Sequence, residues 1–343
     1  MYTIKQVADK LKVTENAIRF YEKKGLMQPI RKENNYRMYQ IEDISRLQMI
    51  LLYRKMGFSI EAILELLKRD EKESLLDIFM KQSILLNQQI HILNEIKKSI
   101  DTCTDQMLNS NKLDESMTAL LEDTASKIAT MSDWTDLWNF DSWAENYDTD
   151  IRKDGDGIPF YKNYDLVIDE TAKAVAKKPG KVLEIGIGTA NLTNQMLKKG
   201  ILKDHIVAID ASRNMLKVAK GKCPDIPMKI GTYLQIPYDP NSIDTVVSSY
   251  AFHHNNDQEK VLAVQEMDRV IGEHGRIIIT DLMFASRKER EKYENSCTDK
   301  IREELQDEYF AYVDELKYIL EDKDYQCKTR QIDPIMWIIV GEK

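Results

Sequence analysis

The sequence holds little of what marks secreted, membrane or metal-cluster proteins. It has four cysteines in 343 residues, far apart and without the paired spacing of a zinc site or a disulfide framework. No apolar run nears the roughly 18 residues that a membrane-spanning helix needs, and the first residues do not form a secretion signal. We therefore expect a cytoplasmic protein with reduced thiols, no membrane segment and no metal ion.

Glycine is also scarce, at 13 residues, and two glycines stand close together in Lys181–Asn191. An apolar strand there ends around Glu184, and Gly186 and Gly188 then let the backbone turn tightly and let a ligand approach its N–H groups. A second apolar run ends in Asp210, about where a dinucleotide-binding fold places an acid on a ribose diol. The stretch predicts a nucleotide-type cofactor site.

The spacing separates two cofactor classes. A dinucleotide loop of the G-x-G-x-x-G type needs glycine at position 191, where this chain has Asn191. The order Glu184-x-Gly186-x-Gly188-x-Ala190 instead resembles the loop of class I S-adenosylmethionine-dependent methyltransferases, with Ala190 in the third glycine position. A carboxylate at the strand tip suits a ligand with a sulfonium and an ammonium group, and it would repel a pyrophosphate.

This resemblance covers further stretches of the chain, namely 140–148, 210–216, 231–238, 242–254 and 266–281. It implies that residues 139–343 form an α/β doubly wound, Rossmann-like domain with S-adenosylmethionine as cofactor. Thr232 stands where many relatives carry an aspartate that binds the adenine amine. The cofactor-binding residues that the resemblance implies are Glu184, Gly186, Gly188, Ala190, Asp210, Ala211, Met215, Thr232, Tyr233, Ser249 and Tyr147.

His253 and His254 follow the fourth strand of this pattern, near where the transferred methyl group would lie. One of them can act as general base toward an acceptor that carries a proton, because histidine exchanges protons near neutral pH. Alternatively, both are scaffold residues that cap a helix or bond the backbone. DNA-methylating enzymes carry an Asn-Pro-Pro-Tyr type motif or a Pro-Cys nucleophile here, and Ser248–His253 has neither. The acceptor is therefore expected to be a small molecule.

The first sixty residues differ in charge from the rest of the chain. They hold 12 Lys or Arg and 6 Asp or Glu, a net of +6, so the whole-chain charge of −8 leaves −14 on the remainder. A basic module joined to an acidic body indicates a polyanionic partner for the first part. Residues 2–21 show two short amphipathic helices, with Thr14 able to cap the second. This is a helix-turn-helix pattern.

Segments 21–31 and 34–39 extend the pattern and resemble the MerR-type winged helix-turn-helix, with Asn35 in the wing turn where glycine is usual. The resemblance implies that residues 1–72 bind double-stranded DNA at a palindromic promoter site, with the second helix in the major groove. Tyr39 is expected to pack in the core of the wing. The DNA-contact residues implied are Lys12, Thr14, Arg19, Tyr21, Lys23, Tyr36 and Arg37.

Between the two patterns, apolar residues recur every seven positions. They predict a coiled-coil helix over 73–110 that buries its seam against a second copy in a homodimer, while packing on the chain's own C-terminal domain is the alternative. Residues 111–138 are expected to form a helical connector. The seam residues are Phe79, Leu86, Leu93, Ile100 and Met107, with Ile90, Ile96 and Cys103 on the same face.

The sequence thus predicts a two-domain, DNA-binding transcriptional regulator whose second domain methylates a small molecule with S-adenosylmethionine. Two alternatives stay open. One is a pure regulator that uses a catalytically decayed methyltransferase fold to sense the cofactor, its product or another small ligand. The other is an enzyme whose DNA-binding module is vestigial.

Overall fold

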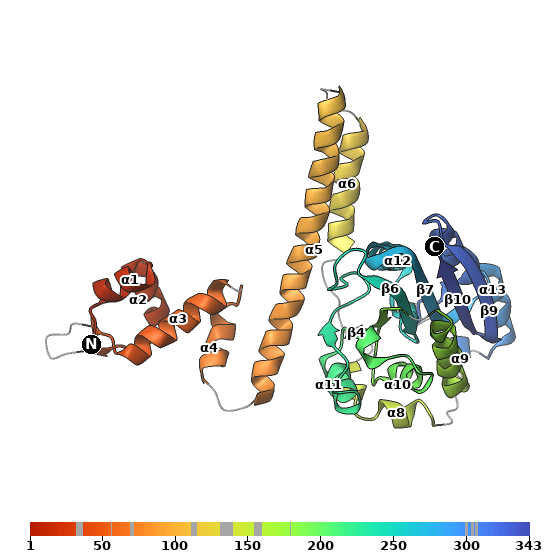
Figure 1. The fold of residues 1–343 in the computed structure, drawn as a ribbon, viewed down its shortest axis with the longest axis horizontal. Coiled ribbons are helices and arrows are strands. Elements are labelled where there is room, and N and C mark those ends of the chain that lie inside the picture. Colours follow the sequence, from red (N-terminus) through yellow and green to blue (C-terminus); the bar gives the residue numbers. More distant parts are fainter. Residues whose placement is uncertain are drawn as a thin grey trace. The chain divides into compact units, whose positions relative to one another are not determined.

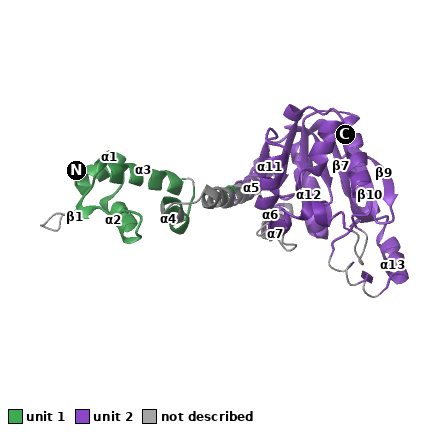
Figure 2. Cartoon of the chain, turned by 90° about the horizontal axis from the view of Figure 1, so that it is seen from below, with its two compact units in different colours: residues 1–86 green, residues 87–343 purple. Residues whose placement is uncertain are grey.

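The structure is a computed structural model of the chain. The chain divides into two compact units, residues 1–86 and 87–343 (Figure 2), and each unit has its own hydrophobic core. The division falls inside one long helix, whereas the sequence places the end of the DNA-binding domain at residue 72. The residues described are 1–31, 37–55, 57–68, 72–110, 115–130, 140–153, 160–178, 180–298, 301–302, 305 and 308–343.

The first unit consists of short helices with a two-stranded wing. Thr3 begins the first helix with a capping box, in which its side chain accepts from Gln6 N and its own N–H donates to the Gln6 side chain. Thr14 caps the second helix as predicted, accepting from Ala17 N at 3.1 Å. The elements are α1 (Ile4–Leu11), α2 (Glu15–Lys23), β1 (Ile30–Arg31), β2 (Arg37–Met38), α3 (Ile41–Lys55) and α4 (Ile60–Lys68).

Glu22 of α2 fastens the wing to the helix. The hydroxyl of Tyr39, which is fully buried, donates to one carboxylate oxygen of Glu22. Arg37 Nε donates to the other oxygen at 2.7 Å. The prediction that Tyr39 packs in the core is therefore confirmed, and the position of Arg37 on the wing is fixed by an ion pair.

The helix predicted between the two patterns is present as α5 (Lys72–Ser110), and α6 (Glu115–Thr130) packs against its second half (Figure 1). The buried hydroxyls of Ser99 and Thr124 lie 2.5 Å apart between these helices, so α6 covers the side of α5 that contains Ser99. No helix in the described part of the chain, α5 included, is long and apolar enough to cross a membrane. Three predicted seam positions spaced by seven residues remain exposed on α5: Leu93, Ile100 and Met107.

The second unit is built on an eight-stranded mixed sheet. Five strands run parallel in the order β5-β4-β3-β6-β7, antiparallel β10 and β9 follow at one edge, and β8 pairs with the end of β7. The chain order reverses between β3 and β6. The strands are β3 (Val182–Ile185), β4 (Ile206–Asp210), β5 (Met228–Ile230), β6 (Ile243–Ser249), β7 (Ile271–Phe284), β8 (Ala311–Tyr312), β9 (Gln326–Asp333) and β10 (Met336–Glu342).

Helices cover both faces of this sheet (Figure 1). In β3, Leu183 and Ile185 join the core formed with α12 and α15, whereas Glu184 between them accepts a hydrogen bond from Thr193 of α10. This alternation is the two-residue period of a strand, and it confirms the predicted doubly wound α/β fold. The helices are α7 (Phe140–Trp143), α8 (Tyr147–Asp150), α9 (Tyr164–Ala176), α10 (Asn191–Lys198), α11 (Arg213–Lys222), α12 (Asp257–Val270), α13 (Arg287–Ser296) and α15 (Val313–Glu321), with 3-10 turns η1 (Lys203–His205) and η2 (Phe252–His254).

A buried arginine ties α9 to the sheet. Arg276 of β7 donates to the carbonyls of Ala174 and Val175 at 3.1 and 2.9 Å, and to that of Lys178 at 2.6 Å. The end of a helix leaves such carbonyls without intrahelical partners. The guanidinium therefore fixes the C-terminal end of α9, just before the chain enters β3.

Arg276→Leu should lower the free energy of unfolding by about 3 kcal/mol, because it removes three hydrogen bonds to carbonyls at the end of α9. Urea unfolding of the full chain measures this. Arg330→Leu is the matched control, since Arg330 is half exposed in its pair with Glu170, and exposed pairs contribute at most about 1 kcal/mol. Equal losses in the two variants would contradict the role given to Arg276.

Candidate cofactor and DNA-binding sites

The candidate cofactor site lies at the carboxyl ends of the parallel strands, where the chain order reverses between β3 and β6. In open α/β sheets this reversal leaves a crevice in which ligands bind. β3 ends at Ile185 and leads into the glycine loop, β4 ends at Asp210, and β6 ends at Ser249. Residues from three separate stretches of sequence therefore meet at one edge of the sheet.

Three alternate positions of the glycine loop have left-handed backbone. Gly186 and Gly188 have φ values of +71° and +53°, and Ala190 has +67°. A Cβ added at Gly186 would lie 2.6 Å from that of Ala251, whereas the space beside Gly188 is open. Gly186 is thus needed to pack the loop on the sheet, and Gly188 offers a surface that a ligand can approach. Ala190 keeps its conformation at a cost of about 1 kcal/mol.

The carboxylate of Asp210 joins the ends of β3 and β4. One oxygen accepts from Gly188 N at 2.8 Å, and the other accepts from Ser212 N at 2.8 Å. Hydrogen bonds to an ionised group are about twice as strong as neutral ones. Asp210 is 9% exposed, so it holds the loop while part of its surface still faces outward.

Glu184 is a buried acid on β3, two residues before the loop turns. It is 1% exposed and accepts from the Thr193 hydroxyl. Burial raises the pKa of Glu184 to about 8; the Thr193 bond acts against this rise, and the charge of Asp210 adds to it. A cationic ligand at this edge would favour the charged form of Glu184 and lower that pKa again.

His253 and His254 lie in η2, directly after β6. Nδ1 of His253 lies 2.5 Å from Oδ1 of Asp281 on β7, and both side chains are buried. Burial lowers the pKa of His253, but the charge and hydrogen bond of Asp281 outweigh it, so that pKa lies above its usual value. Burial holds the pKa of His254 well below its usual value. The pKa values of the two adjacent histidines are therefore shifted in opposite directions.

In the first unit, α2 presents a polar face to solvent. Arg19 and Lys23 are exposed on it, and Arg19 pairs with Glu15 at 2.8 Å. Phe20 is 45% exposed beside them. It is not among the predicted DNA-contact residues, although the sequence shows an aromatic residue next to Arg19 on the second helix. Lys12, at the C-cap of α1, and Thr14 are exposed as well.

Tyr21 is placed differently from the prediction. It is 9% exposed and belongs to the hydrophobic core of the first unit, together with Ile18. Residues three apart share one face of a helix, so Tyr21 points to the core while Arg19 and Lys23 point outward. Its position does not favour the predicted DNA contact. Tyr36, also predicted to touch DNA, lies outside the described residues.

Comparison with known proteins assigns both units. A family profile described as MerR HTH family regulatory protein matches residues 2–70, and one described as Methyltransferase domain matches residues 182–275. An uncharacterized methyltransferase of Alkaliphilus oremlandii is 33% identical over 223 residues, 62% of this chain and 99% of the relative. The chain belongs to the methyltransferases. Its first unit is a MerR-type helix-turn-helix.

Other methyltransferases align over the same region. An uncharacterized methyltransferase of Bacillus cereus is 31% identical over 209 residues, 60% of this chain and 96% of the relative. Among solved structures, magnesium protoporphyrin IX methyltransferase from Synechocystis aligns with a TM-score of 0.46 and 15% identity, covering 60% of this chain and 96% of that one. Family membership follows from the sequence matches.

The methyltransferase unit places the remaining predicted cofactor residues at different depths. Ala211, Thr232 and Ser249 are half-buried and follow or end strands β4, β5 and β6. Tyr233 and Met215 are buried, and the Tyr233 hydroxyl is hydrogen-bonded to β6. The first three can offer a polar or small surface to a cofactor, while the last two belong mainly to the packing beneath it.

Two aspartates that sequence reasoning missed hold α7 and α8 against the site. Asp141 of α7 accepts from Ser212 Oγ at 2.6 Å and from Asn214 N at 3.1 Å, at the start of α11. In the sequence, the repeated acidic residues within 140–148 were the feature that could have indicated this role. α7 is therefore fastened beside the Asp210 end of β4.

The second of these aspartates, Asp148 of α8, reaches the glycine loop itself. It accepts from Thr189 Oγ1 at 2.6 Å and from Asn191 Nδ2 at 2.8 Å, and it pairs with Lys222. Burial raises the pKa of Asp148, but the bonds from Lys222, Thr189 and Asn191 outweigh this and hold it below its usual value. Asn191, which breaks the dinucleotide spacing, is thus a link between the loop and α8.

Aromatic rings line the same edge of the methyltransferase unit. Tyr147 contacts Trp143 and Tyr161 with ring centroids 4.8 and 6.5 Å apart, and Tyr250 contacts Tyr161 and Tyr164 at 5.4 and 5.0 Å. The buried hydroxyl of Tyr250 has no hydrogen-bond partner among the described residues, and its backbone has a left-handed φ of +52°. A buried hydroxyl without a hydrogen-bond partner indicates a place where a ligand or a water molecule supplies that hydrogen bond.

Stability should fall as pH rises from about 5 to about 8, because of Glu184. Its folded pKa of about 8 exceeds the ordinary value of 4.5, so the folded state binds more protons in this window. One such group gives a slope of about 1.4 kcal/mol per pH unit. Urea unfolding at a series of pH values should show that Glu184→Gln removes this slope. Glu273→Gln, at an exposed position near the start of β7, should retain it, and identical profiles for parent and Glu184→Gln would contradict the raised pKa.

Proposed function

We propose that this protein is a DNA-binding transcriptional regulator whose second unit transfers a methyl group from S-adenosylmethionine to a small molecule. The observation that carries the proposal is the edge where buried Glu184, the open space beside Gly188 and the carboxylate of Asp210 come together. Two acids beside an approachable backbone fit a cofactor that carries positive charge and a ribose diol.

The proposed cofactor contacts follow from this edge. Asp210 accepts from the ribose hydroxyls, and Glu184 provides the negative charge that favours the cationic methionine end. Thr232 replaces the aspartate that many relatives use for adenine, so the adenine amine is proposed to bind the Thr232 hydroxyl or backbone groups beside it. Ala211 and Ser249 contribute surface at the neighbouring strand ends.

Methyl transfer needs mainly alignment of the acceptor with the sulfonium, plus a base where the accepting atom carries a proton. The acceptor lone pair attacks the methyl carbon while the carbon–sulfur bond breaks and its electrons return to sulfur. We propose that the acceptor lies against the Tyr250 hydroxyl and the His253–His254 pair, and that one of these histidines takes the proton. Asp281 would then keep Nδ1 of His253 engaged and leave its Nε2 for the proton.

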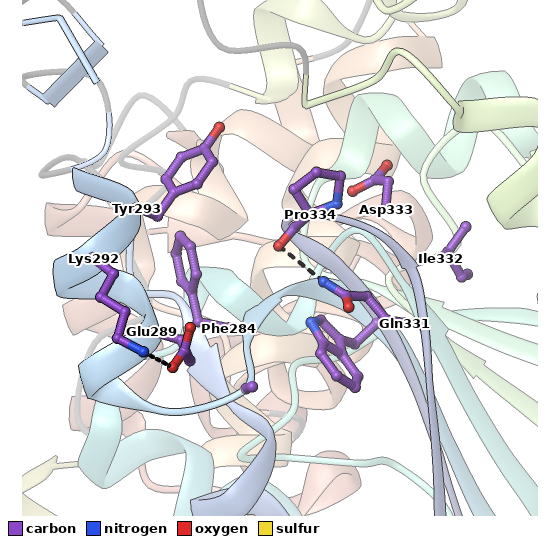
Figure 3. A pocket seen from close by; sticks show the side chains of 10 residues that line it. Phe284, Glu289, Lys292, Tyr293, Gln331, Ile332, Asp333 and Pro334 are labelled. Atoms are coloured by element: carbon purple, nitrogen blue, oxygen red, sulfur yellow. Dashed lines mark hydrogen bonds and ion pairs between the residues drawn. The ribbon is translucent and has the colours of Figure 1, made fainter. Parts of the chain in front are cut away.

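A second feature supports a small ligand for this unit. A cavity of about 790 Å³ opens at the carboxyl end of β7, next to the turn between β9 and β10 (Figure 3). Its size is that of pockets for drug-sized molecules. The indole N–H of Trp337, which lines it, is buried without a hydrogen-bond partner among the described residues. The lining residues are Phe284, Ala285, Glu289, Lys292, Tyr293, Gln331, Ile332, Asp333, Pro334 and Trp337.

For DNA, we propose that α2 enters the major groove and that the wing contacts the phosphate backbone. Arg19 and Lys23 lie on the exposed face of α2, and Arg37 is held on the wing by Glu22. Lys12 and Thr14 flank the turn before α2. These positions carry the proposal, and Tyr21 is left out because its ring is buried in the core.

The regulator is proposed to be a homodimer that reads a palindromic site. The support is the exposed stripe on α5, where Leu93 and Ile100 are 62% and 55% exposed in the single chain although α6 already covers the neighbouring side. A heptad stripe of this kind is buried in coiled coils. Two copies would also supply the two recognition helices that a palindrome requires.

A pure sensor of S-adenosylmethionine or its product is the second candidate function. The observations that favour it are the two departures at the cofactor edge, Ala190 in a left-handed position and Thr232 in place of an acid. Both departures leave binding of the cofactor possible, and both weaken the case for methyl transfer. The labelling experiment below separates the two functions.

Gly188→Ala should abolish binding of S-adenosylmethionine, because the added methyl group fills the open space that we assign to the cofactor. Calorimetry measures the binding, and methyl-labelled cofactor incubated with a metabolite extract should label a small molecule with the parent only. Gly200→Ala is the matched control, since Gly200 also has positive φ and an open surrounding but lies at the far end of α10. Normal binding by Gly188→Ala would overturn the assignment, and tight binding without labelled product would favour the sensor.

Arg37→Ala should weaken binding to a DNA duplex selected from a random pool by the parent protein. The slope of log affinity against log salt should become shallower by about 1, since one phosphate contact is lost. Fluorescence anisotropy over a salt series measures both quantities. Arg330→Ala, exposed on β9, should change neither, and a salt slope equal to the parent's in Arg37→Ala would refute the phosphate contact.

Ile100→Glu should convert the dimer to a monomer, because it places a charge in the proposed seam. Light scattering after size exclusion, over a range of protein concentrations, gives the mass. Leu202→Glu is the control, as Leu202 is equally apolar and 64% exposed but lies outside α5. A monomeric parent, or a dimer that persists in Ile100→Glu, would contradict the proposed seam.

A further inference from the structure

A cluster of potential metal ligands lies beside the end of β6, although the sequence shows no metal-binding motif. His253, His254 and Glu308 each offer one ligand atom, and these three atoms all lie within 4.8 Å of one another. Nε2 of His253 lies 3.7 Å from Oε2 of Glu308, and the two imidazole rings have centroids 3.9 Å apart. Ligand atoms around one zinc ion lie about 3 to 3.5 Å apart, so small side-chain movements close the set.

Asp281 supplies the outer shell that such a site needs. Its Oδ1 lies 2.5 Å from Nδ1 of His253, while its Oδ2 accepts from the backbone N–H groups of Ala251 and Phe252. Metal-bound histidines usually donate their second ring N–H to a carboxylate, which fixes the tautomer and leaves the other nitrogen for the metal. Here the nitrogen left over is Nε2, the one that faces Glu308.

Charge and position at the cluster also favour a cation. Asp281 and Glu308 bring two carboxylates, Asp281 fully buried and Glu308 16% exposed. Lys260 is the cation packed beside them; its Nζ donates to the Tyr309 carbonyl at 2.6 Å and so anchors the residue next to Glu308.

We propose that His253, His254 and Glu308 bind one divalent transition-metal ion of the zinc type, with Asp281 as the outer-shell partner of His253. Two imidazoles and one carboxylate leave coordination positions open, as in catalytic zinc sites. The ring of Phe140 on α7 contacts His254 at 4.9 Å, so the cluster borders the segment that covers the cofactor edge. This role rests on the proposed methyl transfer. The ion would bind an acceptor oxygen and lower the pKa of the acceptor, so that neither histidine needs to take the proton.

The test is zinc binding by the full chain after treatment with a chelator. Calorimetry with Zn²⁺ and visible absorption with Co²⁺ should show one ion per chain. His254→Gln and Glu308→Gln should each weaken binding at least 10-fold, and Asp281→Asn should weaken it by about 10- to 100-fold, as other outer-shell substitutions do. His205→Gln and His274→Gln, at exposed histidines, should bind as the parent does.

Binding of S-adenosylmethionine, measured on the same samples, keeps this proposal separate from the proposed function. Retained cofactor binding shows that a variant is folded. No zinc binding by the parent, or equal zinc affinity in parent, His254→Gln and Glu308→Gln, overturns the metal site and leaves the proposed methyl transfer standing. One zinc ion per chain without any cofactor binding would instead count against the proposed function.

Discussion

The candidate cofactor site depends on one carboxylate. Asp210 ends β4, yet its two oxygens accept from the backbone of Gly188 after β3 and of Ser212 before α11. Because the strands are parallel and adjacent, their carboxyl ends lie at one edge of the sheet. There the Asp210 carboxylate holds the glycine loop in place through its bond from Gly188 N. The left-handed turns at Gly186 and Gly188, the start of α11 and the attachment of α7 through Ser212 all follow from this arrangement.

Around this anchor the methyltransferase unit gathers buried acids. Glu184 and Asp281 are both buried behind neighbouring strand ends, and the raised pKa of Glu184 reflects the cost of that burial. Asp281 is matched by His253, whereas Glu184 accepts from a neutral hydroxyl, so a cationic ligand would lower the cost of burying Glu184. One such acid stands under the glycine loop and the other behind His253, which separates a cofactor side from an acceptor side of the same edge.

Much of this was accessible from the sequence because it is local. The N-cap at Thr14, the glycine loop and the long α5 each depend on residues a few positions apart, whose backbone preferences and spacing are written in the chain. The burial of Tyr39 and the place of Asp210 were also predicted, although their partners Glu22 and Gly188 lie 17 and 22 positions away. The burial of Tyr21 was not predicted, because the core-facing side of α2 is known only once the helix is packed. Asp148 was missed because its partners, Thr189 and Asn191, lie more than forty residues away.

The sequence by itself determined the two families and the order of the units, since each family is marked by motifs within one continuous stretch of the chain. Only the tertiary structure decided which side chains meet: Asp148 with the glycine loop, Glu22 with the wing, and Glu308 with His253 and His254. The physical reason is that such contacts join separate elements at strand ends and helix faces. Spacing along the chain says nothing of their distance until the sheet and its covering helices have brought them together.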